Sequence, residues 1–537
     1  MFTGTWNLIK LILRRDRVKL PLWIICVVGS LLLMIPILKS AYGGAELLQT
    51  LYVQFGSNPA GLLLTGMMDA PTFGGLFTIE TVLWWGLVVA FLNTLLVIRH
   101  TRQNEEIGAQ ELILSCRVSR FSGLAAVLIV AFVTNLVMAS LTFIGLSFVP
   151  DLKDGALLYS LAMGLFGLTW AVIAAIVAQL TESARGANGM LAGLIGVSFL
   201  IRGVGDFLGR PDASGLVRPN WVSSFSPFGW MQATRSLTFP EWWPLLIPVI
   251  FIIVVTPVAF FLLSRRDVGA GLLPSKKGRA RATKFLRTPL GLTVYLQKNV
   301  WIGWTIGISV LMVTIGALVP QMSQVYESSE TLKMMIESMG GTGAMIPTFL
   351  SAMLMLGVLM ILAYTVQALS RIRSEENAGH LENVLATRLG RIKWIFIHLG
   401  VVLFGGLMML VLSGAVLGLA VNLGSEWSVS VWDYIGGALS YFPMVALFAG
   451  LYVLCFGIIP QAAGAISWVF YGFVAFMAWL GPMMQLKQWI LDLSPLAHIA
   501  AAPAETIKVA PLLIIGAAAI AVGLIGLIGW RNRNLTQ

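Results

Sequence analysis

Twelve long stretches of the chain carry almost no charge, and this feature limits the possible folds more than any other. An apolar run of about 18 residues or more is typical of a membrane helix, because about 20 helical residues cross a bilayer core of about 30 Å. In hydrocarbon each backbone N–H and C=O must be bonded within the protein, and these runs lack the alternation of barrel strands. The sequence therefore predicts an all-α integral membrane protein of about twelve transmembrane helices. The predicted spans are 20–38, 81–98, 121–149, 156–180, 187–203, 243–264, 300–320, 347–370, 394–422, 435–457, 462–484 and 510–530.

Charge predicts the orientation of these helices. Only 11% of the residues are charged, against about 25% in an ordinary soluble protein. If both termini are cytoplasmic, about three quarters of the 35 lysines and arginines fall on the cytoplasmic side, where basic residues concentrate. The net charge of +11 then reflects topology and attraction to anionic lipid headgroups, and no nucleic-acid partner is predicted. We expect a multi-pass protein of a bacterial plasma membrane with cytoplasmic N and C termini.

The N-terminus predicts an uncleaved first span. The apolar run that begins at Leu20 is longer than the hydrophobic region of a secretory signal. Before it, residues 2–13 mix large apolar side chains with Lys10, a pattern that favours an amphipathic helix lying on the inner leaflet. The three cysteines show no pairing and no metal-binding spacing.

The chain contains an internal repeat, which is clearest in the loops after the second and eighth spans. Residues 102–120 read RQNEEIGAQELILSCRVSR, and residues 373–391 read RSEENAGHLENVLATRLGR. A second repeated motif is the Ser-Pro pair Ser226-Pro227 and Ser494-Pro495, and basic residues follow the last span of each half. The pairs that match without a gap are Arg102/Arg373, Glu105/Glu376, Gly108/Gly379, Glu111/Glu382, Leu114/Leu385, Arg117/Arg388 and Arg120/Arg391.

The repeat predicts two six-helix domains. The first covers residues 1–270 and includes the N-terminal interfacial helix, and the second covers residues 290–537. A basic cytosolic linker, 271–289, joins them. Because each half has an even number of spans, both insert the same way up and should be related by a twofold axis along the membrane normal.

The matched residues of the loops lie three apart, so each is a helical neighbour of the next. Ion pairs such as Arg102–Glu105 and Arg373–Glu376 contribute a few tenths of a kcal/mol, and a glycine after them breaks the helix. One interpretation is a generic helical hairpin with basic flanks. The other is a docking element offered twice to a twofold cytosolic partner.

The pattern R-x-x-E-x-x-G-x-x-E-x-x-L, followed by R-x-x-R, resembles the first cytosolic loop of ATP-binding-cassette (ABC) exporter permeases. Within that class the fused twelve-span chain resembles antibiotic and polyketide exporters. The resemblance implies that loops 100–120 and 371–391 are coupling helices seated on two ABC ATPase subunits, either a homodimer or a heterodimer. It also implies re-entrant helices at 222–238 and 490–506. The residues that it assigns to coupling are Arg102, Glu105, Gly108, Glu111, Arg373, Glu376, Gly379 and Glu382.

One departure separates the two loops, because Asn377 stands in the second copy where the first has Glu106. It puts strict equivalence of the halves in doubt. The chain also lacks the G-x-x-x-x-G-K-[ST] loop that cradles nucleotide phosphates. We therefore expect a transport subunit that is not itself an enzyme and holds no cofactor or metal, with ATP and Mg bound by the partner ATPase.

The main alternative is a secondary transporter, which would need ionisable residues at membrane depth. The predicted span interiors are nearly free of them. Glu80 lies at an outer edge, Arg202 and Asp206 near the outer end of the fifth span are expected to snorkel, and His398 is expected to be buried or interfacial. A membrane-embedded enzyme would need converging catalytic groups, which this sequence lacks. A scaffold or receptor subunit is a further alternative.

The expected substrate is a hydrophobic small molecule, because aromatic and methionine side chains in the spans suit adaptable apolar cavities. The same side chains are also common in simple helix packing. The residues predicted to line the path are Trp84, Trp85, Phe91, Met353, Phe473 and Met477, with Met355, Met360, Phe470, Tyr471 and Phe476 as further candidates.

Overall fold

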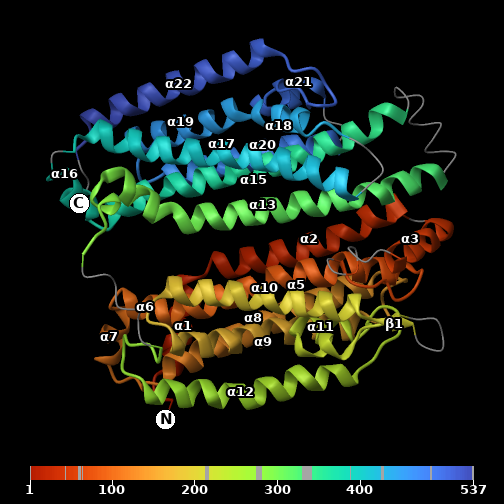
Figure 1. Ribbon diagram of the computed structural model, residues 1–537. Coiled ribbons are helices and arrows are strands. Elements are labelled where there is room, and N and C mark those ends of the chain that lie inside the picture. Colours follow the sequence, from red (N-terminus) through yellow and green to blue (C-terminus); the bar gives the residue numbers. More distant parts are fainter. Residues whose placement is uncertain are drawn as a thin grey trace. The chain divides into compact units, whose positions relative to one another are not determined.

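The structure, a computed structural model, divides into two compact units, Met1–Gly278 and Arg279–Gln537 (Figure 1). Each unit is described by itself. The division falls in the stretch 271–289, of which residues 274–280 lie outside the described residues. The structure describes the chain apart from residues 1, 43, 58–61, 63–64, 212–216, 274–280, 329–341, 388, 425–428, 484–486 and 535–537.

The first unit is a bundle of long helices that are joined by short helical pieces. Its two short strands, β1 (Arg210–Pro211) and β2 (Val217–Arg218), pair antiparallel. The helices are α1 (Thr5–Arg15), α2 (Lys19–Tyr42), α3 (Ala45–Ser57), α5 (Phe73–His100), α6 (Arg102–Glu106), α7 (Ala109–Leu114), α8 (Ser122–Ser147), α9 (Ala156–Leu180), α10 (Ala184–Phe207), η1 (Trp221–Phe225), α11 (Pro227–Gln232), η2 (Trp243–Leu245) and α12 (Leu246–Arg265).

The second unit likewise combines long helices with short helical pieces. Its large buried cluster includes Tyr364, Phe448 and Trp530. The helices are η3 (Phe285–Arg287), α13 (Pro289–Ser328), α15 (Thr342–Asn377), α16 (His380–Leu385), α17 (Arg391–Gly424), α18 (Val431–Leu439), α19 (Phe442–Ile458), α20 (Ala463–Met483), α21 (Gln488–Leu491), η4 (Pro495–His498) and α22 (Val509–Asn532).

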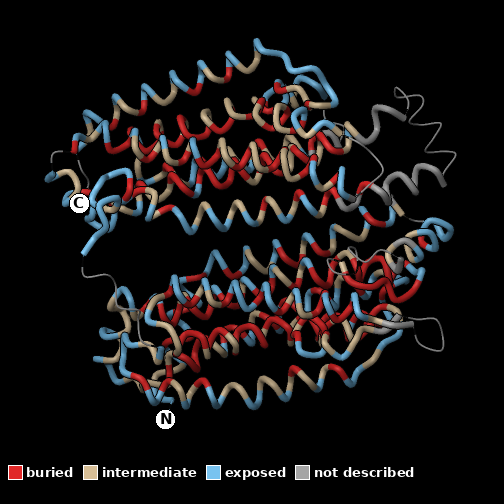
Figure 2. The backbone as a smooth tube through the Cα atoms, viewed as in Figure 1, coloured by how far each residue is buried: buried red, intermediate tan, exposed pale blue. Residues whose placement is uncertain are grey.

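Eleven helices among the described residues are long and apolar enough to cross a membrane. With the helical architecture of both units, they confirm the predicted all-α membrane protein. The one remaining predicted span, 462–484, falls on α20. Its apolar helical part among the described residues, Ala463–Trp479, is shorter than the other eleven. The last helix of each unit, α12 or α22, has few buried residues (Figure 2).

Two predicted spans begin too late. Helix α5 starts at Phe73 rather than 81, because the Thr72 side chain accepts a hydrogen bond from the Gly75 N–H and caps the helix. Helix α13 starts at Pro289 rather than 300, so Gln297 and Lys298 belong to this helix and do not precede it. Proline suits this position because its fixed φ and missing N–H cost nothing in the first helical turn.

The N-terminal amphipathic helix forms as predicted. In α1 one face carries the buried residues Leu8, Ile9 and Ile12 and packs against α8, while Trp6 and Leu11 are exposed. The side chain of Asp16, just after α1, is buried. It forms an ion pair with Arg99 at 3.0 Å and a hydrogen bond with the His100 ring at 2.5 Å, both at the end of α5. This contact fixes α1 to the base of the α5 helix.

The polar residues within the helices are mostly paired. Asn93 of α5 and Asn135 of α8 are both buried, and each side-chain N–H₂ donates to the other's carbonyl oxygen, at 3.1 and 2.6 Å. His398 is buried, with a ring nitrogen 3.2 Å from the Trp394 carbonyl, which confirms the expectation of a buried or interfacial histidine.

We expect Asn135→Ala to lower the free energy of unfolding by about 1–3 kcal/mol, because it leaves the buried Asn93 amide without its partner. The double variant Asn93→Ala/Asn135→Ala should cost less than the sum of the two single variants, since no amide is then orphaned. Thermal unfolding of the four proteins in one detergent measures this coupling. Strictly additive losses would contradict it.

Arg202 and Asp206 correct an expectation from the sequence. Both side chains are fully buried and form an ion pair one turn apart on α10, with Nη1 3.0 Å from Oδ2. The interpretation that they snorkel is therefore wrong. The pair is also held by the Leu62 carbonyl, which accepts from Arg202, and by Ser223, whose hydroxyl donates to Asp206.

Candidate functional site

The first repeated loop is built as its glycine predicts. Helix α5 ends at His100, α6 runs to Glu106, and Gly108 then takes a φ of +73° before α7 begins. In the second loop α15 runs to Asn377, and Gly379 takes a φ of +71° before α16. Residues other than glycine rarely adopt these positive φ values, so glycine is required for the same sharp bend in both halves.

Arg102 is the centre of the first loop. Its side chain is fully buried, and its guanidinium donates to the carbonyls of Ala178, at the end of α9, and Ala270, after α12. It also lies 2.8 Å from the carboxylate of Glu105. One side chain thus ties the loop to the ends of two other helices.

Glu105 forms a second link. Its carboxylate accepts from Arg266, the residue directly after α12, and the Nη1–Oε2 distance is 2.8 Å. The side chain of Glu105 is only 8% exposed, and that of Arg266 2%. Arg266 also donates to Gln179 near the end of α9. Glu105 is therefore shared between two arginines and joins the loop to the last helix of its unit.

The second unit repeats this arrangement. Glu376 accepts from Arg373 at 2.7 Å and from Arg533, which follows α22. The Arg533 guanidinium also lies 4.8 Å from the centre of the buried Trp530 ring. The backbone carbonyl of Arg533 accepts a hydrogen bond from Arg391 at the start of α17. The residue that corresponds to Arg266 in this network is thus Arg533.

The loop tips carry the exposed residues. Glu111 and Glu382 are both exposed, in contrast to the nearly buried Glu105 and Glu376. In the first loop Ile107 and Leu112 are 62% and 74% exposed. The predicted coupling residues therefore fall into two groups, one that braces the loop internally and one that is accessible from outside. Arg388, one of the matched repeat positions, lies outside the described residues.

Glu106 makes a contact to which its counterpart in the second loop, the uncharged Asn377, cannot bring a negative charge. Its carboxylate accepts from the N–H of Ala184 at 3.0 Å, at the start of α10, where a negative charge also suits the helix dipole. Asn377 is exposed and carries no charge. The predicted difference between the two loops therefore lies at a helix terminus.

The residues predicted to line a substrate path lie apart from these loops. Trp84 and Phe91 are 45% and 41% exposed on α5, and the indole N–H of Trp85 donates to the Val27 carbonyl at 3.1 Å. Met353 and Phe473 pack partly buried against the core of the second unit. Met477 lies half-buried on α20. The structure does not gather these six side chains around one described cavity.

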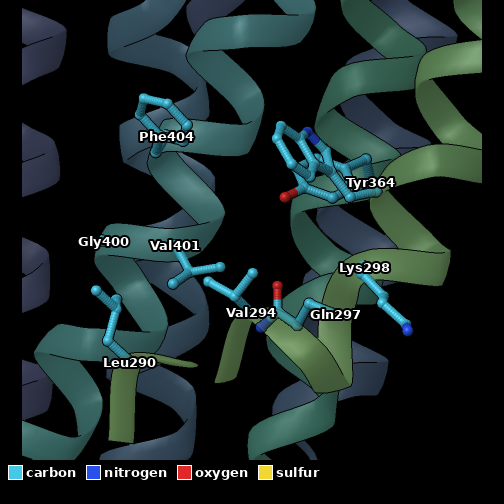
Figure 3. Close-up of a pocket in the computed structure, with 9 residues that line it drawn as sticks. Leu290, Val294, Gln297, Lys298, Tyr364, Gly400, Val401 and Phe404 are labelled. Atoms are coloured by element: carbon cyan, nitrogen blue, oxygen red, sulfur yellow. The ribbon is translucent and has the colours of Figure 1, made fainter. Parts of the chain in front are cut away.

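A cavity of about 320 Å³ does lie within the second unit. Its walls come from α13, α15 and α17, and Figure 3 shows Val294 and Gln297 of α13 facing Val401 of α17. The prediction from the sequence missed this site because it placed Gln297 before the span. A helix start at Pro289, where proline suits the first helical position, would have included it. The lining residues are Leu290, Val294, Gln297, Lys298, Trp301, Tyr364, Gly400, Val401 and Phe404.

A further charged cluster lies in the first unit, before α5 and after α11. Asp69 pairs with Arg235 at 3.0 Å, and both side chains are nearly buried. Burial raises the pKa of the Asp69 carboxyl to about 6, an effect that Arg235 opposes and that Asp206 and Glu241 reinforce. Asp69 is therefore the described acid outside the helices that is set to change charge near neutral pH.

We expect protonation of Asp69 to stabilise the first unit. An acid with a raised folded pKa gives stability that is fully present below its unfolded pKa, near 3.8, and that is lost as pH rises through about 6. The melting temperature of the wild type, relative to that of Asp69→Asn, should fall between about pH 4 and about pH 7. Asp151→Asn, at a half-exposed acid, is the matched control. Parallel pH profiles for wild type and Asp69→Asn would refute the assignment.

Comparison with known proteins agrees with this architecture. Residues 286–531 match the family described as the C-terminal domain of multidrug efflux system permease Rv1217c. The whole chain is 29% identical to the multidrug efflux system permease protein Rv1217c of Mycobacterium tuberculosis, and the alignment covers 99% of this chain and 96% of the relative. The chain is therefore a multi-pass protein of the bacterial plasma membrane that is similar, over its whole length, to a multidrug efflux permease.

Proposed function

We propose that this chain is the membrane-spanning permease of a drug-efflux system that is driven by two separate ATPase subunits. The observation that carries the proposal is the duplicated network in which Glu105 and Glu376 join a glycine-bent loop to the last helix of each unit. Similarity to a multidrug efflux permease supports the transported class, hydrophobic drugs or antibiotics.

The networks give each loop a means of moving helices. Glu105, Arg102 and Arg266 connect α6 with the ends of α9 and α12 through buried, charge-assisted hydrogen bonds, which are about twice as strong as neutral ones. Displacement of the loop by a partner would therefore carry these helix ends with it. A partner that binds two conformations of the loops with different affinity shifts the equilibrium between them.

The exposed tips suit a partner's surface. Ile107 and Leu112 flank the acidic Glu111 on the first loop, so an apolar groove with a basic rim would fit them. The second loop instead exposes His380 and Glu382 around Gly379. This difference supports contacts of unequal strength with the two ATPase subunits, and it leaves both a homodimer and a heterodimer possible.

The energy source in this proposal lies outside the chain. The sequence has no phosphate-binding P-loop, so ATP and Mg would be bound by the partner subunits. The secondary-transporter alternative requires ionisable groups free to titrate along the path. In the described part of the chain, the carboxylate of Asp206 is held in an ion pair with Arg202, which does not favour that alternative.

The proposal is tested by drug efflux from intact cells that express the full chain with its partner. Efflux should persist when an ionophore collapses the proton gradient while ATP is maintained, and it should stop when ATP is depleted. Affinity purification of the chain should also bring an ATP-hydrolysing subunit with it. Efflux that stops with the proton gradient at normal ATP would contradict the proposal.

A further inference from the structure

The cavity of the second unit is lined by one face of α13. Leu290, Val294, Gln297 and Trp301 follow one another at helical spacing and all line the cavity. Figure 3 shows Val294 and Gln297 on the side of α13 that faces Val401 of α17. Its volume of about 320 Å³ is at the lower end of the range for small-molecule sites. Lys298 points away from the cavity in Figure 3, and its ammonium group lies 4.2 Å from the centre of the Tyr295 ring. The interior is therefore apolar and uncharged.

Gln297 is the exception in this apolar wall. Its side chain is 4% exposed, and among the described residues neither its amide nitrogen nor its amide oxygen has a hydrogen-bond partner. The indole N–H of Trp301, one turn further along α13, is likewise without an acceptor in the described part of the chain. Within a membrane helix no bulk water is at hand to satisfy such groups, so leaving them unpaired is costly.

Other polar side chains show that the helices of this protein can pair such groups. Trp304, the next tryptophan on α13, donates its indole N–H to the side-chain oxygen of Gln367 on α15. In the first unit, Asn93 of α5 pairs with Asn135 of α8 in both directions. The unpaired groups of Gln297 and Trp301 thus belong to two side chains that line the cavity. Departures of this kind from a local rule are expected at functional sites.

Tyr364 completes a polar end of the cavity. Its hydroxyl donates to the Val402 carbonyl over a long distance of 3.5 Å and retains its acceptor capacity. An added Cβ at Gly405 would collide with this hydroxyl, so the glycine lets the tyrosine ring lie against α17. Gln297, Trp301 and Tyr364 together supply two kinds of N–H donor and two acceptor oxygens.

We propose that this cavity binds one uncharged, hydrophobic molecule that carries a group able both to donate and to accept hydrogen bonds, such as a carboxamide. A pure hydrocarbon chain fills the apolar volume but leaves the Gln297 amide unpaired. A carboxamide pairs with Gln297 in both directions and leaves its oxygen accessible to Trp301. That this molecule is an exported cargo, and not a resident lipid, rests on the efflux function proposed above.

Binding is tested with two probes of matched length, tritiated dodecanamide and tritiated dodecane, on the purified full chain in lipid nanodiscs without nucleotide or partner. Gln297→Leu should weaken dodecanamide binding at least tenfold and leave dodecane binding unchanged. The unliganded Gln297→Leu protein should also melt at a higher temperature than wild type, because an unpaired buried amide is removed. Gln367→Leu, at an exposed amide that already accepts from Trp304, is the matched control and should keep wild-type amide binding.

Equal dodecanamide affinity in wild type and Gln297→Leu would overturn the proposal. If Gln297→Leu also loses dodecane, its cavity has changed shape, and Trp301→Phe then decides. Trp301→Phe should lower the affinity for dodecanamide more than the affinity for dodecane. Equal losses of affinity for the two probes would overturn the proposal. Export from intact cells separates cargo from lipid. If Gln297→Leu selectively loses efflux of dodecanamide, the bound molecule is an exported cargo. If the wild type binds dodecanamide but does not export it, the cargo assignment is overturned. Because binding is measured without ATP, this result is independent of how transport is powered.

Discussion

Replacing Glu105 and Glu376 with alanine should abolish drug efflux while the chain still reaches the membrane. Each carboxylate is shared by two arginines and links a loop to the residue that follows the last helix of its unit. Without it, the buried Arg102 and Arg266 lose the carboxylate that they share, and breaking a buried pair in this way costs about 3–5 kcal/mol. The loop would then no longer move with α12 or α22. Efflux from cells, normalised to the amount of chain in the membrane, measures the effect.

Glu111→Ala/Glu382→Ala is the matched control for that double variant. These acids are exposed at the loop tips, so the melting temperature should stay within experimental error of wild type. The amount of ATPase that copurifies should nevertheless fall, because the substitutions remove charges that face the partner. Normal efflux by Glu105→Ala/Glu376→Ala would show that the internal links do not transmit force.

Arg102→Leu should destabilise the protein far more than Arg373→Leu, although the two positions match in the repeat. The Arg102 side chain is fully buried and holds Ala178, Ala270 and Glu105 together. The Arg373 side chain is 20% exposed, so water can replace part of its interaction. We expect a loss of about 3–5 kcal/mol for Arg102→Leu, the range for breaking a buried pair, and about 1 kcal/mol for Arg373→Leu, nearer the value of exposed pairs.

Thermal unfolding of both variants in the same detergent, followed by a probe in each unit, checks this difference. Arg117→Leu, an exposed arginine of the same loop, is the control and should change the melting temperature little. Equal losses for Arg102→Leu and Arg373→Leu would mean that burial does not decide the strength of the two networks.

The membrane helices could be predicted from the sequence because their cause is local. An uncharged run of sufficient length must satisfy its own backbone in hydrocarbon, and a helix does so wherever its neighbours lie. The boundaries at Phe73 and Pro289 were harder, because the predicted spans began at 81 and 300, just after the charged residues Glu80 and Lys298. A cap at Thr72 and a proline at the first helical position are weaker signals than a charge.

The bend at Gly108 and Gly379 and the ion pairs Arg102–Glu105 and Arg373–Glu376 could also be predicted, since both follow from residue type and helical spacing. The partners Arg266 and Arg533 could not, because they lie far along the chain and only tertiary packing brings them to the loops. Burial of the Arg202–Asp206 pair was missed for the same reason. A sequence shows that two charges are one turn apart, but not whether other helices cover them.

The central claim is that this chain does work only when force is applied from outside through its two repeated loops. Its most direct test uses the purified chain alone, sealed into vesicles with a hydrophobic fluorescent drug and no nucleotide. With a proton or sodium gradient imposed across the vesicle membrane, the drug should not accumulate, and accumulation should appear only after the partner ATPase and ATP are added. Gradient-driven accumulation by the chain alone would contradict the claim.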